Sequence, residues 1–163
     1  MKVSYYSRLS PEHISILEEF TKDVPVKVGA LAKALGLKVV VAALPLKISG
    51  LIKPDPDGGF VIKVNRFEPK ERQRFTIAHE IAHFLLHRDK IQAGVVDSVL
   101  YRSKLSSRVE AEANRLAADI IMPLDKVSEL SAVYRTQGDH QIIATLAETF
   151  QVSRQAMEIR TGD

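Results

Sequence analysis

The stretch Phe75-Thr76-Ile77-Ala78-His79-Glu80-Ile81-Ala82-His83-Phe84-Leu85-Leu86 decides how this chain is interpreted. Apart from Thr76, its only polar side chains are two histidines and one glutamate. A helix that is apolar all round is a buried helix, and buried histidine and carboxylate groups need partners. His79 and His83 would share one face of that helix, one turn apart. The sequence therefore predicts a buried helix whose polar side chains converge on a common partner.

The spacing H-E-x-x-H favours a divalent metal ion as that partner. His79 and His83 can bind one ion together, while Glu80 projects about 100° round the helix from His79. Glu80 can therefore reach a water molecule at the ion without being a ligand. The alternative is a pair of core histidines bonded to backbone groups. His87 repeats the spacing but lies about 12 Å along the axis from His79, so we expect it to interact with the carbonyl groups at the helix end.

A third metal ligand must come from elsewhere, because catalytic zinc usually has three protein ligands and one open position. The chain has no cysteine, so this ligand must be His, Asp or Glu. The predicted helix over 108–121 offers Glu110 and Glu112. At 100° per residue Glu110 lies at the edge of the apolar face, with Asn114 one turn on, whereas Glu112 lies on a charged stripe that we expect to face solvent. We predict Glu110 as the ligand and Asn114 as the residue that supports a ligand by hydrogen bonding.

Other interpretations of this region stay open. Ser107 and Glu110 match a capping box, S-x-x-E, which would explain Glu110 without a metal. If neither glutamate binds metal, Asp97 and Asp119 are the next candidates for the third ligand.

Length, composition and charge describe an ordinary globular chain. The 163 residues are 45% hydrophobic and 26% charged, which is typical of one domain with a sizeable core. We expect a single domain over 1–163, with a helical tail over 137–163 packed on it. The net charge of +3 is too small to argue for nucleic-acid binding. The longest apolar run, 39–46, is too short to cross a bilayer, and the start does not have the form of a secretory signal, so we expect a cytoplasmic location.

The remaining patterns predict a small sheet followed by helices, an α+β fold. A Ser-Pro pair opens the first helix, and Asp57-Gly58-Gly59 favours a hairpin between the last two strands, so we expect a mostly antiparallel sheet. Residues 88–104 are predicted to form a long loop. The other expected elements are a helix over 29–35, strands over 38–43, 47–52 and 60–64, a long helix from Pro69 to about His87, and tail helices that include 141–150 and a turn starting at Ser153.

Several segments resemble the ImmA/IrrE family of metallo-endopeptidases. The matching segments are 74–87, Glu110 to Pro123, Ile62-Lys63-Val64-Asn65, and Val24-Pro25-Val26 leading into 31–36. The resemblance implies a zincin-like fold and one catalytic zinc ion held by His79, His83 and Glu110. It also implies that Glu80 is the general base, and that the substrate is a helix-turn-helix repressor of the Xre type, often encoded nearby. Ala82, Leu116 and Ile120-Ile121 depart from the family's frequent residues, but none of them touches the proposed chemistry.

Peptide hydrolysis also needs a stabiliser for the oxyanion besides the metal. Tyr101 and His140 are candidates because both lie in expected loop regions; the alternative for each is an ordinary surface residue. The expected strand over 47–52 could be an edge strand that pairs with an extended peptide substrate.

Two alternative functions stay open. The tail segment 146–156 resembles part of a helix-turn-helix, so the chain could be a regulatory protein that binds a repressor or DNA, with an inactive or tightly regulated peptidase site. Only Arg154 and Arg160 supply basic charge there, so direct DNA binding is not favoured. The third possibility is a zinc hydrolase that acts on something other than peptides.

Overall fold

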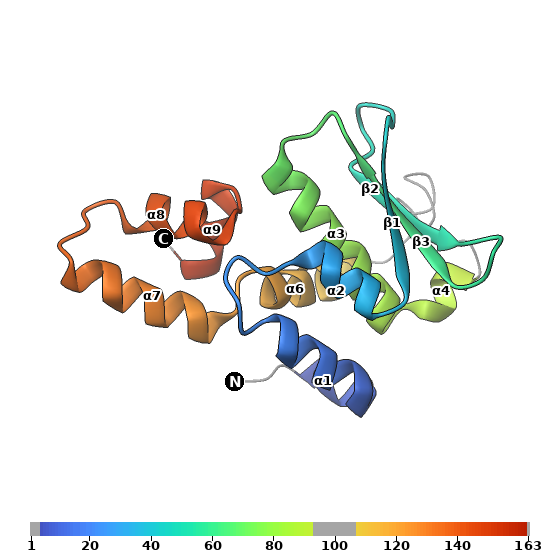
Figure 1. The fold of residues 1–163 in the computed structure, drawn as a ribbon, viewed down its shortest axis with the longest axis horizontal. Coiled ribbons are helices and arrows are strands. Elements are labelled where there is room, and N and C mark those ends of the chain that lie inside the picture. Colours follow the sequence, from blue (N-terminus) through green and yellow to red (C-terminus); the bar gives the residue numbers. More distant parts are fainter. Residues whose placement is uncertain (1–3, 93–106, 163) are drawn as a thin grey trace.

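The chain is described here by a computed structural model that covers residues 4–92 and 107–162 (Figure 1). Its elements are, in order, the 3-10 helix η1 (Ser4–Arg8), α1 (Pro11–Phe20), α2 (Val28–Ala34), β1 (Leu37–Ala42), β2 (Gly50–Pro54), β3 (Phe60–Asn65), α3 (Lys70–Leu86), α4 (Arg88–Gln92), α6 (Ser107–Ile121), α7 (Leu124–Thr136), α8 (Ile142–Phe150) and α9 (Arg154–Thr161). The predicted α+β fold is confirmed. In the predicted loop over 88–104, α4 is present, and residues 93–104 lie outside the described ranges. None of the helices that the structure describes is long and apolar enough to cross a membrane.

The first helix begins where its capping signal predicts. Ser10 has an extended backbone conformation, and its hydroxyl oxygen accepts a hydrogen bond from the backbone N–H of His13. Pro11 occupies the first helical position, where it has no N–H to leave unpaired. The local sequence is therefore sufficient to define this helix start.

The three strands form a mixed sheet in the order β1-β3-β2. β2 and β3 are antiparallel, with Ile52 opposite Ile62, as the predicted hairpin requires. Gly58 and Gly59 in its turn have φ values of 101° and 71°, which glycine adopts without strain. β1 pairs with β3 in parallel, so the prediction of a mostly antiparallel sheet is wrong. The chain between β1 and β2 does not form a hairpin, so these two strands are not neighbours. β3 lies between them and pairs with both.

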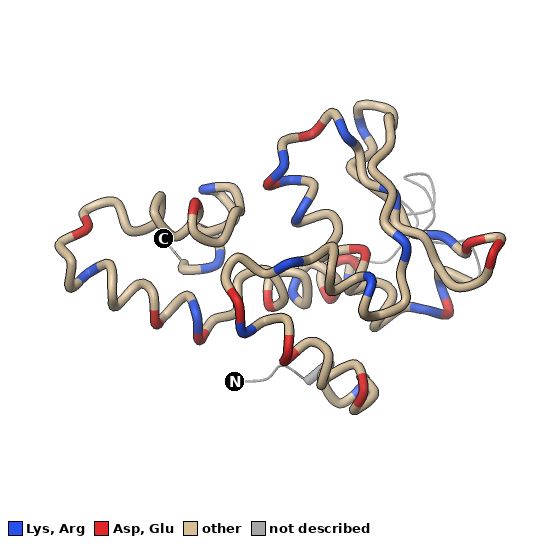
Figure 2. Tube along the Cα trace, in the orientation of Figure 1, with Lys and Arg blue, Asp and Glu red and all other residues tan. Residues whose placement is uncertain are grey.

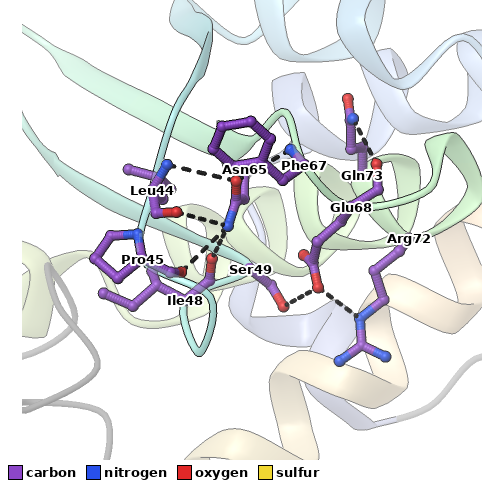
Figure 3. Close-up of polar contacts among 9 residues, drawn as sticks. All are labelled: Leu44, Pro45, Ile48, Ser49, Asn65, Phe67, Glu68, Arg72 and Gln73. Carbon is purple, nitrogen blue, oxygen red and sulfur yellow. Dashed lines mark hydrogen bonds and ion pairs between the residues drawn. The ribbon is translucent and has the colours of Figure 1, made fainter.

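Asn65, at the end of β3, holds the loop that joins β1 to β2 (Figure 3). Its side-chain oxygen accepts hydrogen bonds from the backbone N–H groups of Leu44 (3.4 Å) and Phe67 (3.1 Å). Its amide nitrogen donates to the carbonyls of Leu44 and Pro45, both at 3.2 Å, and of Ile48 at 2.9 Å. Because Asn65 is only 1% exposed, water cannot readily replace these contacts.

The helix α3 lies against the sheet on one side and α6 on the other (Figure 1). All residues from Thr76 to Leu85 are buried, which confirms the predicted buried helix. Pro69 is its N-cap and His87 its C-cap. The polar motif residues therefore lie inside the protein, between the sheet and a second helix.

The helices α8 and α9 pack on the same hydrophobic core as the rest of the described chain. Leu146, Phe150 and Met157 are fully buried in one cluster with Ile81 of α3 and Leu116 of α6. The two helices are joined by a short turn that includes Gln151 in the left-handed conformation. They therefore form a helix-turn-helix arrangement that is part of the core.

Two arginines attach this helix pair to α3 and to the end of α6. Arg74 of α3 donates to the carbonyls of Phe150 (3.3 Å) and Gln151 (3.1 Å), at the C-terminal end of α8. Arg160 of α9 donates to Asp119 Oδ1 at 2.7 Å, and its Nε donates to a backbone carbonyl just after α6. Cations at helix C-termini complement the helix dipole, so the two contacts hold the pair of α8 and α9 in place.

Candidate metal centre

Three side chains from α3 and α6 converge in the structure. His79 Nε2 lies 3.3 Å from Glu110 Oε2, and His83 Nε2 lies 3.0 Å from Glu110 Oε1. One ligand atom from each residue can be chosen so that all three lie within 4.8 Å of one another. The structure therefore brings together the two histidines and the glutamate that the sequence predicts as a ligand set. The Glu110 carboxylate faces the histidines, which is the position that a metal ligand needs.

The polar atoms of this triad fit a metal ion. His83 Nε2 and Glu110 Oε1 are both buried and close together, yet within the described ranges neither atom has a hydrogen bond with suitable geometry. Buried polar atoms are normally satisfied, and a cation between the two would satisfy both. Two imidazole nitrogens and one carboxylate oxygen are a ligand set found in catalytic zinc sites, where a fourth position stays open.

The electrostatic environment favours the protonation states that metal binding needs. Burial lowers the pKa of the His83 imidazole, which favours its neutral form. Burial raises the pKa of the Glu110 carboxyl, but contacts with the His79 and His83 rings oppose this effect and lower it well below its usual value. A neutral imidazole and an ionised carboxylate can both act as ligands near neutral pH.

His79 and Glu110 lie in the wall of a pocket of about 680 Å³. Phe75 and Thr76 of α3 line the same side of it, and residues of α9 line another, among them Ile159, which is 75% exposed. Figure 1 shows α9 facing the first turns of α3. A ligand in this pocket can therefore reach the triad.

The loop between β1 and β2 contributes one further side of the pocket. Ser49, just before β2, lines it and donates a hydrogen bond to Glu68 Oε2 at 3.2 Å (Figure 3). Arg72 Nε lies 3.7 Å from the same carboxylate oxygen. Because Asn65 fixes this loop, it also sets where Ser49 and the start of β2 lie relative to the triad.

The other predicted site residues have different positions. Glu80 is fully buried beside the triad on α3. Asn114 lines the pocket with an exposed side chain, and its support of a ligand stays a prediction. His140 lines a separate pocket that contains neither triad histidine, so the structure does not bring it to the site; it lies in the turn before α8. Tyr101 lies outside the described residues.

Of the alternative third ligands, Asp119 is not part of the triad, and its carboxylate accepts a hydrogen bond from Arg160. Asp97 lies outside the described residues.

The prediction that Glu112 faces solvent is wrong. Its side chain is 17% exposed, less than the 30% of Glu110, and it forms an ion pair with Arg8 at 2.7 Å. Its other oxygen lies 3.1 Å from His87 Nε2. A charged stripe on a helix faces solvent only if no other segment covers it. Arg8, at the end of η1, covers this face of α6.

The prediction for His87 is also wrong, because its ring does not bond to carbonyl groups at the helix end. The side chain is 3% exposed, and its Nδ1 lies 3.0 Å from His83 Nδ1. His87 is not one of the three converging ligands, as its distance along the helix predicts. Its four-residue spacing from His83 is the sequence signal that could have shown this contact.

The charges around Glu112 stabilise its ionised form. The hydrogen bond from His87 lowers the pKa of the Glu112 carboxyl, and Arg8 lowers it further, against the effect of burial. Burial lowers the pKa of the His87 imidazole, although its contact with Glu112 opposes this. An ionised carboxylate therefore faces a largely neutral histidine ring.

A buried H-E-x-x-H helix with a glutamate from a second helix, beside an open pocket, is the arrangement of zincin-type metallopeptidases. The family comparison agrees, because residues 32–161 match the model of the M78 peptidases that is described as the IrrE N-terminal-like domain. The chain belongs to this family, as its resemblance to ImmA/IrrE proteins predicts.

Two curated relatives are similar to part of the chain. The radiation response metalloprotease IrrE of Deinococcus radiodurans is 33% identical over 102 residues, which are 60% of this chain and 30% of that protein. The protein of the same name from Deinococcus deserti is 33% identical over 93 residues, 57% of this chain and 32% of that protein. These matches span about a third of the length of either relative.

A solved structure of a Mycobacterium tuberculosis transcriptional regulator has a similar fold. Its TM-score is 0.57 at 19% sequence identity, over 96% of this chain and 49% of that one. This likeness supports the arrangement of helices and sheet over nearly the whole chain.

Proposed function

We propose that this chain is a zinc-dependent endopeptidase that cleaves a specific protein, a helix-turn-helix repressor. The observation that carries the proposal is the convergence of His79, His83 and Glu110 beside an open pocket. Membership in a family of metallopeptidases supports the peptide bond as the target.

Each residue of the site has a chemical task in this proposal. Zinc bound by His79, His83 and Glu110 would polarise the scissile carbonyl and acidify the attacking water. Glu80, which follows His79 on the same helix, takes the proton from that water and delivers it to the leaving amine.

The sheet offers a place for an extended substrate. Within the described ranges β2 (Gly50–Pro54) is at one edge of the sheet, which agrees with the edge strand expected near 47–52. Ser49 lines the pocket immediately before this strand. A peptide that pairs with β2 would continue into the pocket, where Phe75 and Ile159 offer apolar contacts to its side chains.

The helix-turn-helix arrangement of α8 and α9 does not favour DNA binding as the function. Arg154 is paired with Glu158 at 3.0 Å and Arg160 with Asp119 at 2.7 Å. Acidic and basic residues occur together on α9, as Figure 2 shows. Ile159 of α9 lines the pocket beside the triad, so we propose that this helix binds the substrate of the peptidase.

The choice of repressor as substrate rests on the family resemblance. It is tested by incubating the purified, zinc-loaded chain with the helix-turn-helix repressor encoded nearest to it and identifying the fragments by mass spectrometry. Wild-type protein should give defined fragments. Glu80→Gln should keep its zinc and bind the intact repressor without cutting it, because the ligands are unchanged and the base is lost.

A matched control for this experiment is Glu19→Gln. Glu19 forms an exposed ion pair with Lys22 at the C-terminal end of α1, so its loss should leave cleavage unchanged. Equal cleavage by wild type and Glu80→Gln would contradict the mechanism. Zinc content that is unchanged in His83→Ala would contradict the site.

A further inference from the structure

A continuous series of polar contacts runs from the surface to one of the proposed zinc ligands. Arg8 contacts Glu112 Oε2 at 2.7 Å, and Glu112 Oε1 lies 3.1 Å from His87 Nε2. His87 Nδ1 in turn lies 3.0 Å from His83 Nδ1. The four residues come from η1, α6 and the C-terminal part of α3, so the series ties three separate segments to the site.

The chemistry of these groups fixes the direction of each hydrogen bond. An arginine can only donate and an ionised carboxylate can only accept, so His87 Nε2 must carry the hydrogen that reaches Glu112. In a neutral ring the other nitrogen is then an acceptor, so His87 Nδ1 accepts from His83 Nδ1–H. His83 is left with an unprotonated Nε2, and that atom faces Glu110 at 3.0 Å.

The inner part of this series is shielded from water. The side chain of His83 is fully buried and that of His87 is 3% exposed, whereas Arg8, at the outer end, is 43% exposed. Arg8 also donates to the carbonyl of Leu86 at 3.2 Å, at the end of α3. Bulk solvent therefore has little access to the contact between His83 and His87.

We propose that Arg8, Glu112 and His87 are positioning residues that hold His83 in the tautomer and ring orientation in which Nε2 binds the metal. This proposal rests on the proposed function, because it requires His83 to be a ligand. The alternative is a purely structural role, in which His87 only fills the space between α3 and α6. A histidine that binds metal is normally oriented through its other nitrogen, and here a second histidine makes that contact.

The first test reads the tautomers directly and does not depend on activity. Nitrogen-15 NMR of the histidine rings in the metal-free protein should show His87 protonated at Nε2 and unprotonated at Nδ1. In the zinc-loaded protein His83 should be bound through Nε2 and protonated at Nδ1. A His87 ring protonated at Nδ1 alone would overturn the proposal, even if the chain binds zinc.

The second test measures zinc affinity by competition with a chelator. His87→Leu should weaken binding about 10-fold to 100-fold, the range for loss of a residue that orients a ligand. His87→Gln should recover most of this loss, because its side-chain carbonyl can accept from His83 Nδ1–H. Glu19→Gln is the control and should bind zinc as wild type does.

Metal-free unfolding in urea separates positioning from packing. If His87→Leu and His87→Gln lose the same stability and the same zinc affinity, the role is structural and the proposal fails. If His87→Leu does not fold, Arg8→Met replaces it, because this outer residue is partly exposed and its loss should weaken zinc binding only a few-fold. A zinc affinity within twofold of wild type in Arg8→Met, with the tautomers of His83 and His87 unchanged, would also overturn the proposal. Absence of zinc binding by wild type would instead contradict the proposed function.

Discussion

Replacing Asn65 by aspartate should destabilise the protein strongly, although the two side chains have nearly the same shape. The variant Asn65→Asp keeps oxygen acceptors for the backbone N–H groups of Leu44 and Phe67. It loses both amide hydrogens, which in the wild-type protein donate hydrogen bonds to the carbonyls of Leu44, Pro45 and Ile48. The new carboxylate would also lie against these carbonyl oxygens, which repel it.

The magnitude follows from how many of these groups water can reach. Pro45 is exposed, so its carbonyl can be hydrated, but Leu44 and Ile48 are partly buried and Asn65 itself is 1% exposed. Two carbonyls without donors cost roughly 1–3 kcal/mol each, and the buried carboxylate adds to this. We expect a loss of about 3–5 kcal/mol, which lowers Tm by about 6–20 °C in a chain of this size.

Urea unfolding of the metal-free protein measures this loss without a contribution from bound zinc. The loss should shrink as the pH falls, because burial raises the pKa of the new carboxyl and its protonated form regains a donor. The control is Asn114→Asp at an exposed position, where we expect a change of less than about 0.5 kcal/mol. A loss below about 1 kcal/mol in Asn65→Asp would show that Asn65 does not hold the loop.

Two other variants test the site, and a third tests the turn before α8. Glu110→Gln should weaken zinc binding more than about 100-fold, or about 2.8 kcal/mol, because it removes the anionic ligand; zinc affinity within tenfold of wild type in chelator competition would count against the ligand set. Ile159→Asp should lower the rate of repressor cleavage at least about tenfold, as an apolar wall of the pocket becomes charged, while zinc affinity stays the same; unchanged cleavage would remove α9 from the substrate site. Asp139 has a pKa lowered by hydrogen bonds from the Thr145 hydroxyl and a backbone N–H, so its contribution to stability is present above its usual pKa of 3.8 and is lost as the pH falls through its lowered value. The stability advantage of wild type over Asp139→Asn should therefore shrink below about pH 4, and an advantage that grows with acidity would refute this.

The features that the sequence predicts correctly depend on short-range patterns. Ser10 caps the first helix and the two glycines at 58–59 form the hairpin turn, because both act on residues within a few positions. The convergence of His79 and His83 follows from helical spacing alone. The inward position of Glu110 follows from the apolar face of its own helix.

The features that it misses depend on contacts between distant segments. The parallel pairing of β1 with β3 depends on the path of the chain between β1 and β2. No local sequence pattern predicts that path. Arg8 is 104 residues from Glu112 in the chain, and a helical projection of α6 cannot show that η1 covers that face. The spacing of His87 predicts only a position at its own helix end, because its partner Glu112 lies on a different helix.

The position of α9 has a consequence for how members of this family can diverge. The ligand set lies on α3 and α6, whereas one wall of the pocket is supplied by a helix that begins more than forty residues after Glu110. The family match extends to residue 161, the last residue of α9, so this wall belongs to the shared domain. If α9 binds the substrate as proposed, substitutions on its exposed side would alter which sequence is accepted while the proposed ligands stay fixed. Under this proposal selectivity and chemistry would evolve at separate places in the chain, and exchanging α9 between relatives would transfer the substrate preference of one to the other.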